Sequence, residues 1–220
     1  MQRIAIYDMD KTITRAPTWT AFLRHATRRQ WRMLLWPAAA AAAIGYGARL
    51  LDRAALKQAT QRLMLGSRLT QARATALAEG FADRLLADGV LAEALTRIAA
   101  DRAAGYRLVL ATASYGFYVD AIARRLGFDA VIATGSVRDG ETIRARIAGA
   151  NCYGEAKLAM IRAWLAEQGI ARGDVHVRFY SDHVSDAPTL AWADEPFAVN
   201  AHGPLRRLAA EQGWPQLDWR

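Results

Sequence analysis

The chain has 220 residues, a formal net charge of +8 at pH 7 and a hydrophobic fraction of 53%. This length and composition exclude a disordered chain and allow one or two domains with a sizeable core. The positive charge favours anionic partners, which include phosphorylated small molecules, anionic lipids and nucleic acid. The single cysteine, Cys152, cannot form an internal disulfide, and no signal-peptide pattern precedes the first predicted strand. Both features predict a cytoplasmic protein.

The first predicted element is a short β-rich run over residues 4–7, which is followed by Asp8 and Asp10. A strand that continued through both acids would point their side chains to the same side. Two adjacent carboxylates repel each other unless a metal ion, a cation or a shared proton compensates. The pair therefore indicates a metal or acid/base site, although solvated acids at a strand end explain this motif equally well when it is taken alone.

Residues 16–90 form a predicted helical region, in which residues 56–65 and 71–86 carry apolar side chains at helical spacing. Its first part is strongly cationic, because no Asp or Glu occurs between Lys11 and Leu51 whereas arginines are frequent. Within this part, residues 33–48 carry no charge and include six consecutive alanines.

The uncharged segment 33–48 is shorter than the ~20 residues of a membrane-spanning helix, and Pro37, Gly45 and Gly47 interrupt it. Two interpretations remain open. The segment is either a buried helical hairpin that closes over the rest of the protein, or an anchor on an anionic membrane surface, together with the arginines present in residues 24–49.

The remaining sequence alternates between predicted helices and strands. A helix begins near residue 91 and ends near Gly105, and the later elements are a strand at 107–114, a helix at 117–127, a strand at 130–134, a hairpin at 136–147, a helix at 155–168, a strand at 175–181, a helix at 187–193 and a strand at 197–200. This alternation predicts an α/β fold with a doubly wound, Rossmann-like parallel sheet, in which ligands bind outside the carboxyl ends of the strands.

Three further groups of polar residues coincide with the ends of predicted elements. The tripeptide Thr112-Ala113-Ser114 ends a strand and offers hydroxyl and N–H groups to an anion. Lys157 lies at the start of a helix, where its charge opposes the helix dipole, so we expect a specific partner for it. A solvated surface lysine is the simpler explanation of this residue alone. Asp182 follows a strand, and Asp186 comes four residues later.

Together and in this order, these residues resemble the motifs of the haloacid dehalogenase-like (HAD) hydrolase superfamily. Asp8-x-Asp10-x-Thr12 is similar to its first motif, Thr112 to its second, Lys157 to its third, and Asp182 with Asp186 to its fourth. The long segment between the first two motifs resembles the phosphoserine phosphatase-like branch, subfamily IB. The tail over residues 200–215 resembles bacterial members related to phosphatidylglycerophosphatase C and the CicA-type proteins. The resemblance implies a HAD catalytic core over residues 1–15 and 91–220, with an inserted all-helical cap over residues 16–90.

The resemblance also implies a role for each motif residue. Asp8 would attack phosphorus and form an aspartyl phosphate, and Asp10 would act as general acid and base. The substrate phosphate would lie against Thr112-Ala113-Ser114 and Lys157. Mg²⁺ would be held by Asp8, the backbone carbonyl of Asp10 and Asp182, while Asp186 would orient a metal-bound water or Lys157. For His183, inside the fourth motif, we expect a surface or structural role rather than metal ligation.

Asp10 also separates reaction classes. Dehalogenases of the superfamily lack an acid at this place because a halide leaving group needs no proton, so Asp10 favours phosphoryl transfer. P-type ATPases share an Asp-Lys-Thr sequence, but a chain of 220 residues is too short to include their membrane domain. We therefore expect a Mg²⁺-dependent phosphomonoester hydrolase.

The substrate is less closely defined by the sequence. Phosphoserine phosphatases place an acid shortly after the first motif for the ammonium group of the substrate, and residues 14–19 contain none. We expect a lipid-linked or other non-amino-acid phosphomonoester, such as phosphatidylglycerophosphate. Phosphoserine or a soluble sugar or polyol phosphate is the alternative substrate, and a noncatalytic membrane-surface module is the alternative function. Nucleic acid is not expected, because basic and aromatic residues are not interleaved as in base-stacking modules.

Overall fold

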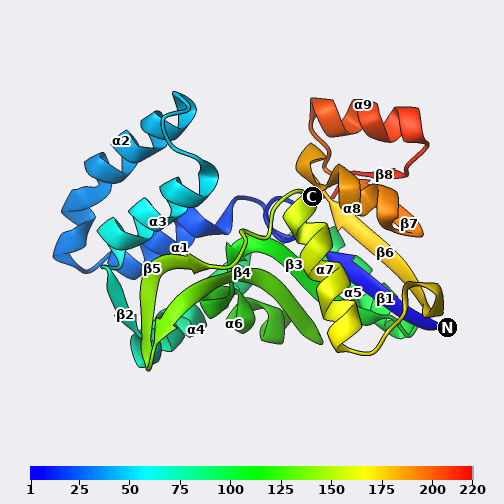
Figure 1. Ribbon diagram of the computed structural model, residues 1–220, viewed down its shortest axis with the longest axis horizontal. Coiled ribbons are helices and arrows are strands. Elements are labelled where there is room, and N and C mark those ends of the chain that lie inside the picture. The colour runs from blue at the N-terminus through cyan, green and yellow to red at the C-terminus, as the bar shows by residue number, and fades with distance from the viewer. Residues whose placement is uncertain (220) are drawn as a thin grey trace.

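The computed structural model describes residues 1–219, which are built around one eight-stranded sheet (Figure 1). The strands are β1 (Gln2–Tyr7), β2 (Arg68–Thr70), β3 (Arg107–Tyr115), β4 (Ala130–Asp139), β5 (Thr142–Ala148), β6 (Val175–Ser181), β7 (Glu195–Val199) and β8 (Gln216–Leu217). The α-helices are α1 (Thr18–Thr27), α2 (Trp36–Gly47), α3 (Arg53–Met64), α4 (Gln71–Asp88), α5 (Ala92–Ala103), α6 (Gly116–Leu126), α7 (Glu155–Glu167), α8 (Ala187–Trp192) and α9 (Gly203–Gln212). Short 3₁₀ helices are η1 (Trp31–Leu35), η2 (Arg172–Asp174) and η3 (Val184–Asp186).

The strand order is β2-β5-β4-β3-β1-β6-β7-β8, and the six strands from β4 to β8 in this order are parallel. The chain runs outward from β1 through β3 to β4, and later returns to β6 on the other side of β1. The carboxyl end of β1 is therefore the point at which the winding direction changes, where doubly wound sheets bind ligands. The predicted fold class is confirmed.

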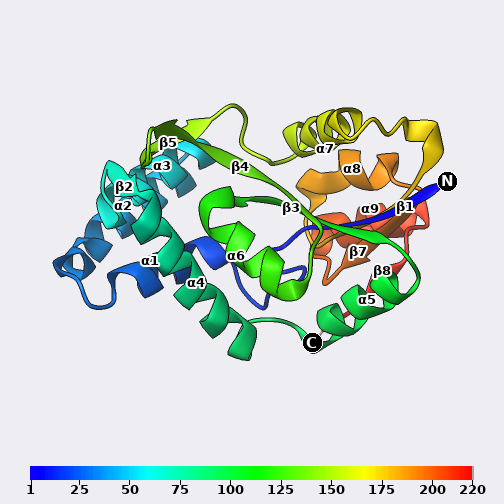
Figure 2. The ribbon, with the colours of Figure 1, turned by 90° about the horizontal axis from the view of Figure 1, so that it is seen from below.

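Alternate side chains of β1 enter two hydrophobic clusters, one on each face of the sheet. Ile4 and Ile6 pack on the face covered by α7, α8 and α9, whereas Ala5 and Tyr7 pack on the face covered by α5 and α6 (Figure 2). Burial on both faces explains why the run that precedes Asp8 is continuously apolar.

Two predicted elements differ in the structure. The strand predicted at 130–134 and the first arm of the predicted hairpin form one strand, β4, which pairs with β3 in its first half and with β5 in its second. The segment expected to be all-helical contains the short strand β2. Its residue Leu69 is buried and pairs with Ile143 of β5. A strand of three residues has too short a pattern to be distinguished from a loop in the sequence.

The two connections to residues 16–90 run side by side. Thr14 and Val90 form an isolated antiparallel bridge, and Leu91 N donates to Ile13 O at 2.9 Å. One hydrophobic cluster nevertheless continues from Phe81 of α4 to Tyr118 of α6. The division into a core and a cap at residues 15/16 and 90/91 therefore stays a prediction.

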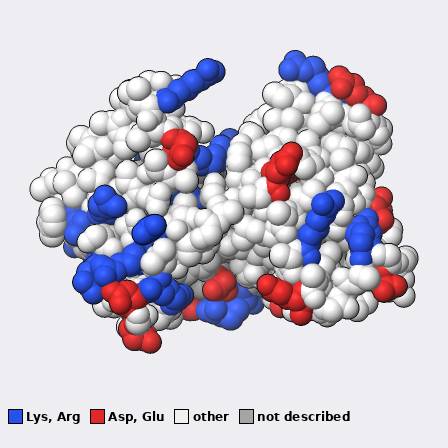
Figure 3. Space-filling model, viewed as in Figure 1, with Lys and Arg blue, Asp and Glu red and all other residues white. Residues whose placement is uncertain are grey.

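The uncharged segment is not a buried hairpin. In η1, α2 and the loop that follows, Trp31, Met33, Leu34, Ile44 and Leu50 are 66%, 53%, 77%, 73% and 80% exposed, respectively. Ala39 is the one buried residue of α2, all of which the structure describes. Figure 3 shows this part of the surface, at the upper left, as largely free of charged side chains. Within residues 1–219, no helix combines the length and the hydropathy needed to cross a membrane.

A buried carboxylate ties α5 to the centre of the sheet. Asp101 is 1% exposed and accepts hydrogen bonds from Tyr7 Oη at 2.5 Å, Tyr180 Oη at 2.8 Å and Arg178 Nη1 at 2.6 Å. Since Tyr7 and Tyr180 lie in the adjacent strands β1 and β6, this acid fixes the two strands whose ends carry the motif acids.

We predict that Asp101→Ala lowers the free energy of unfolding by about 3–5 kcal/mol, because it leaves two buried tyrosine hydroxyls and Nη1 of the Arg178 guanidinium without their acceptor. Urea denaturation followed by circular dichroism measures this change. Asp83→Ala, which removes an acid that is 68% exposed, is the matched control and should cost below ~1 kcal/mol. Equal losses in the two variants would contradict the structural role of Asp101.

Candidate active site

The two acids of the first motif converge through a loop rather than along a strand. β1 ends at Tyr7, before either acid, and Asp8 N donates to Tyr180 O at 2.9 Å. The chain then turns, with Ile13 N bonded to Met9 O and Lys11 in the left-handed region at φ 64°. The strand alternation that the sequence suggested for Asp8 and Asp10 is therefore not what places them. The turn sends the two carboxylates to different partners.

Lys157 has the specific partners that its place at a helix start predicted. It is the third residue of α7 and is 2% exposed. Its Nζ donates to Asp8 Oδ1 at 2.7 Å and to Asp186 Oδ2 at 2.6 Å. Asp186 Oδ2 also accepts from Ser181 Oγ at 2.7 Å. The third and fourth motifs thus meet the first one in a single buried ion-pair network.

Thr12 brings Asp182 to Asp8. Its Oγ1 accepts from Asp182 N at 3.0 Å and lies 3.3 Å from Asp8 Oδ2 and 3.5 Å from Asp182 Oδ1. Because the hydroxyl has one proton, it can donate to one of these carboxylate oxygens at a time. The two acids therefore face a common space at the ends of β1 and β6.

This space has more negative than positive charge. Burial raises the pKa of Asp8 to about 7, with Lys157 opposing the shift and Asp186 and Asp182 adding to it. Burial and Asp186 raise the pKa of Asp182 to about 6. Burial alone would lower the pKa of Lys157, but Asp186 and Asp8 outweigh it, so the pKa lies above its usual value. The ammonium group of Lys157 is hydrogen-bonded to two of the three carboxylates, those of Asp8 and Asp186.

The donor set fits a hard divalent cation. Asp8 and Asp182 supply carboxylate oxygens, and the buried Oδ1 of Asp186 has no hydrogen-bond partner within residues 1–219. Among the residues that the structure describes, no three His, Cys, Asp or Glu side chains gather to hold a metal by themselves. Two carboxylates with carbonyl, water and substrate oxygens form the kind of site that Mg²⁺ uses.

Asp10 is held from the helical segment and from β3. Its Oδ1 accepts from Thr18 N at 2.8 Å and from Thr18 Oγ1 at 2.7 Å, at the start of α1. Its Oδ2 accepts from Ser114 Oγ at 3.1 Å. The first turn of α1 contains no acid of its own, so Asp10 provides the negative charge that a helix N-terminus favours.

Ser114 does not lie where the sequence predicted. Thr112 and Ala113 line the cavity with the motif acids, whereas Ser114 does not. The hydroxyl of Ser114 is bonded to Asp10, and its N–H donates to Thr112 Oγ1 at 3.1 Å. The reason is an irregularity in the pairing of β3 with β4 after Thr112, which turns Ser114 away from the cavity. Its contact is therefore with the acid rather than with a phosphate.

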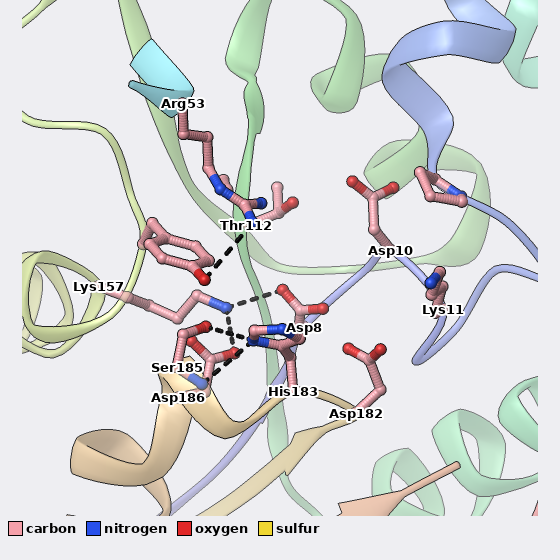
Figure 4. A pocket seen from close by; sticks show the side chains of 13 residues that line it. Asp8, Asp10, Lys11, Arg53, Thr112, Lys157, Asp182, His183, Ser185 and Asp186 are labelled. Atoms are coloured by element: carbon pink, nitrogen blue, oxygen red, sulfur yellow. Dashed lines mark hydrogen bonds and ion pairs between the residues drawn. The ribbon is translucent and has the colours of Figure 1, made fainter. Parts of the chain in front are cut away.

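The motif residues line one cavity of about 290 Å³ (Figure 4). Its wall also contains Lys11, Pro17, Arg53, Tyr153, His183 and Ser185. Arg53 comes from the start of α3 and points toward the motif residues, with its guanidinium 4.1 Å from the ring centre of Tyr153. His183 Nδ1 accepts from Ser185 N at 3.1 Å. Burial and Arg53 lower the pKa of His183.

A second residue of α3, Lys57, reaches the same region from behind the cavity. Its side chain is buried, and its Nζ donates to Ala113 O and, at 2.6 Å, to Asn151 Oδ1. Burial lowers the pKa of Lys57 to about 8. The sequence did not lead us to predict either cation of α3. Their i, i+4 spacing, which places them on one helix face, was the signal available.

Comparisons with known proteins agree with this geometry. Residues 5–191 match the model of the family described as haloacid dehalogenase-like hydrolase. A probable phosphatase of Mycobacterium tuberculosis is 35% identical over 130 residues, 59% of this chain and 44% of that protein. A phosphoserine phosphatase of the same organism is 30% identical over 147 residues, 66% of this chain and 46% of that protein. The chain thus spans less than half the length of these curated relatives.

Among solved structures, a protein of unknown function from Bordetella pertussis Tohama I has a TM-score of 0.89 and 26% sequence identity, and 99% of each chain is covered. The family match covers most of the chain, from β1 to α8, and includes all four motifs around the cavity. The chain belongs to the haloacid dehalogenase-like hydrolase family.

Proposed function

We propose that this protein is a Mg²⁺-dependent phosphomonoester hydrolase that works through an aspartyl phosphate at Asp8. The observation that carries the proposal is the meeting of Asp8, Lys157 and Asp182 at the carboxyl end of β1, with Asp10 held beside them. Curated relatives include a probable phosphatase and a phosphoserine phosphatase, which supports the same reaction class.

The two steps use the two acids of the first motif. An oxygen of Asp8 attacks phosphorus, the bond from phosphorus to the leaving oxygen breaks, and Asp10 donates a proton to that oxygen. Water then attacks the aspartyl phosphate and gives a proton to Asp10. The bond between phosphorus and Asp8 breaks, which releases inorganic phosphate and restores both acids.

Other groups stabilise the negative charge that develops during phosphoryl transfer. Lys157 lies 2.7 Å from Asp8 and can pair with an oxygen of the phosphoryl group as negative charge moves onto it. Mg²⁺, when bound, would neutralise phosphoryl charge. Asp8, Asp182 and the backbone carbonyl of Asp10 would hold the ion, and Asp186 would orient a bound water or Lys157.

We predict that Asp8→Asn lowers the turnover of an aryl phosphate roughly 10³-fold or more, because the amide cannot form the phosphoenzyme. Chelation of Mg²⁺ should abolish wild-type turnover, and added Mg²⁺ should restore it. Asp174→Asn, an exposed acid remote from the motifs, is the matched control and should turn over normally. Equal activity of Asp8→Asn and the wild type would contradict the mechanism. No turnover of any phosphomonoester, with liposome binding intact, would select a noncatalytic membrane-surface module.

We propose that Lys57 positions the loop Thr112-Ala113-Ser114, which faces the phosphoryl group. Lys57 Nζ and, at 2.7 Å, Thr134 Oγ1 both donate to Ala113 O. The carbonyl of Ala113 and the N–H of Ser114 belong to one peptide group, and that N–H donates to Thr112 Oγ1. The peptide is therefore fixed on both sides, and the residue that fixes it from the helical segment is Lys57.

We predict that Lys57→Met lowers kcat about tenfold, with a smaller change in KM, because loss of this anchor loosens the loop that faces the phosphoryl group. The free energy of unfolding should change by less than ~2 kcal/mol, since the buried charge is removed together with its hydrogen bonds. Steady-state kinetics and urea denaturation measure both. Arg62→Met, an exposed cation of the same helix, should change neither, and an unchanged kcat in Lys57→Met would refute the positioning role.

For the substrate, we propose a lipid-linked or other non-amino-acid phosphomonoester, such as phosphatidylglycerophosphate. The exposed apolar side chains of η1 and α2 support this, because they offer a surface for shallow insertion into a bilayer. Exposed arginines precede and follow them at Arg24, Arg28, Arg29 and Arg49, and each contributes on the order of 1 kcal/mol near an anionic membrane. No acid lies between residues 12 and 51 to offset them.

A soluble substrate is the alternative. One relative is named a phosphoserine phosphatase, but Pro17 is the cavity-lining residue contributed by residues 14–19 and offers no carboxylate to an ammonium group. Sugar and polyol phosphates are also compatible with Arg53 and Tyr153 at the wall, since a shared fold does not define the substrate.

We predict at least tenfold higher phosphate release from a lipid phosphomonoester in mixed micelles than from phosphoserine or glycerol 3-phosphate. The double variant Leu34→Glu/Ile44→Glu should remove this preference and the salt-sensitive pelleting with anionic liposomes, while aryl phosphate turnover stays unchanged. Leu95→Glu, at an exposed apolar residue of α5, is the control and should keep both. Failure of the wild type to pellet at low salt, with efficient turnover of a soluble substrate, would overturn the membrane proposal.

A further inference from the structure

A second cavity, of about 690 Å³, lies between α1 and α4, which Figure 2 shows side by side. It is larger than the catalytic cavity of about 290 Å³. Its wall is apolar where Phe81 and Leu85 of α4 face Ala21 of α1. Phe81 and Leu85 are buried, so a hydrocarbon group in this cavity would contact side chains that already belong to the core.

The rim of this cavity is cationic. Four exposed arginines line it, namely Arg15 before α1, Arg24 in α1, Arg28 directly after α1 and Arg84 in α4. Within the described part of the chain, none of their guanidinium groups pairs with a carboxylate. Asp88 is the one acid among the described residues that line the cavity. The rim therefore has a net positive charge that the protein itself does not neutralise.

The other acids of this part of α4 face away from the cavity. Glu79 and Asp83 pair with Arg124 and Arg125 of α6 at 2.5–2.8 Å. Acidic residues are therefore present on the same helix but are engaged on its opposite side. The unpaired state of the four rim arginines is a property of this face and does not result from a lack of acids in α4.

His25 adds a polar atom without a partner. It lines the cavity, and its buried Nδ1 has no hydrogen-bond partner within residues 1–219. Burial and the guanidinium groups of Arg28 and Arg84 lower the pKa of His25. Both cations therefore lie near the His25 ring. Like charges gathered around one cavity raise its free energy unless an anion compensates.

We propose that the cavity between α1 and α4 is a second binding site, distinct from the catalytic cavity, for an amphipathic anion: a carboxylate or phosphate head group with an attached apolar chain. The head group would lie among the rim arginines, and the chain would cover Ala21, Phe81 and Leu85. The site adjoins the catalytic one, because Pro17 lines both cavities and Thr18, which holds Asp10, lines the second. It does not depend on the proposed reaction.

Isothermal titration of the full chain with decanoate, below its micelle concentration and without Mg²⁺, tests the proposal. We expect saturable one-to-one binding that is at least tenfold tighter than the binding of acetate, which supplies only the head group, or of decyl maltoside, which supplies only the chain. Decanoate is not a phosphate ester, so hydrolysis does not interfere. Binding should weaken as salt is raised, because arginines contribute to it.

Variants locate the site. Arg28→Ala/Arg84→Ala should weaken decanoate binding at least tenfold, and Ala21→Met, which fills the apolar wall without a change of charge, should also weaken it. Arg206→Ala/Arg207→Ala removes two exposed arginines of α9 and should have less than a twofold effect. Arg53→Ala, in the catalytic cavity, should have equally little. Unsaturable binding, or equal losses in the α9 and Arg28/Arg84 variants, would overturn the proposal, and a loss confined to Arg53→Ala would place the anion in the catalytic cavity instead.

Discussion

The buried ammonium group of Lys157 is the interaction on which the rest of the site depends. Without it, Asp8, Asp182 and Asp186 would be three carboxylates facing one largely buried space, which costs free energy unless cations compensate. Lys157 reaches Asp8 and Asp186 because α7 starts directly after Gly154, whose φ of 60° lies in the region that favours glycine. The turn before α7 thus helps to position Lys157.

The strand order brings the acids of two motifs together. Asp8 follows β1, and Asp182 follows β6, the neighbour of β1 in the sheet. Asp101 ties these two strands together, because it accepts hydrogen bonds from Tyr7 of β1 and Tyr180 of β6. A few hydrogen-bonded groups in the interior therefore determine where the carboxylates of two distant motifs meet.

Residues 16–90 complete the site instead of only covering it. Thr18 holds Asp10, Arg53 forms part of the cavity wall, and Lys57 fixes the peptide after Ala113. In the proposed mechanism, the general acid and the loop that faces the phosphoryl group are therefore oriented by the segment that also carries the exposed apolar surface. The same segment, residues 16–90, therefore contacts the motif residues and carries the exposed apolar side chains.

The sequence was sufficient for the sheet and for the motif residues that follow strands, because buried strands and their polar ends have a strong local pattern. Asp8 and Asp182 belong to this group. It was not sufficient for Ser114, since an irregularity of strand pairing turned that residue toward Asp10. Lys57 and Arg53 were missed because an amphipathic pattern gives the apolar face of a helix but not the loop that its cations will meet. The exposure of residues 33–48 depends on which helices pack, which no local pattern determines.

The covalent bond between phosphorus and Asp8 is the step on which the proposed mechanism rests. An activated aryl phosphate has a leaving group that needs no proton, so Asp10→Asn should still form the aspartyl phosphate but hydrolyse it slowly. Rapid acid quench of this variant with such a substrate, followed by peptide mass spectrometry, measures the intermediate directly. The mechanism predicts one phosphoryl group on the peptide that contains Asp8, and none in Asp8→Asn/Asp10→Asn. Turnover without any phosphorylated peptide, or a label on another residue, would contradict it.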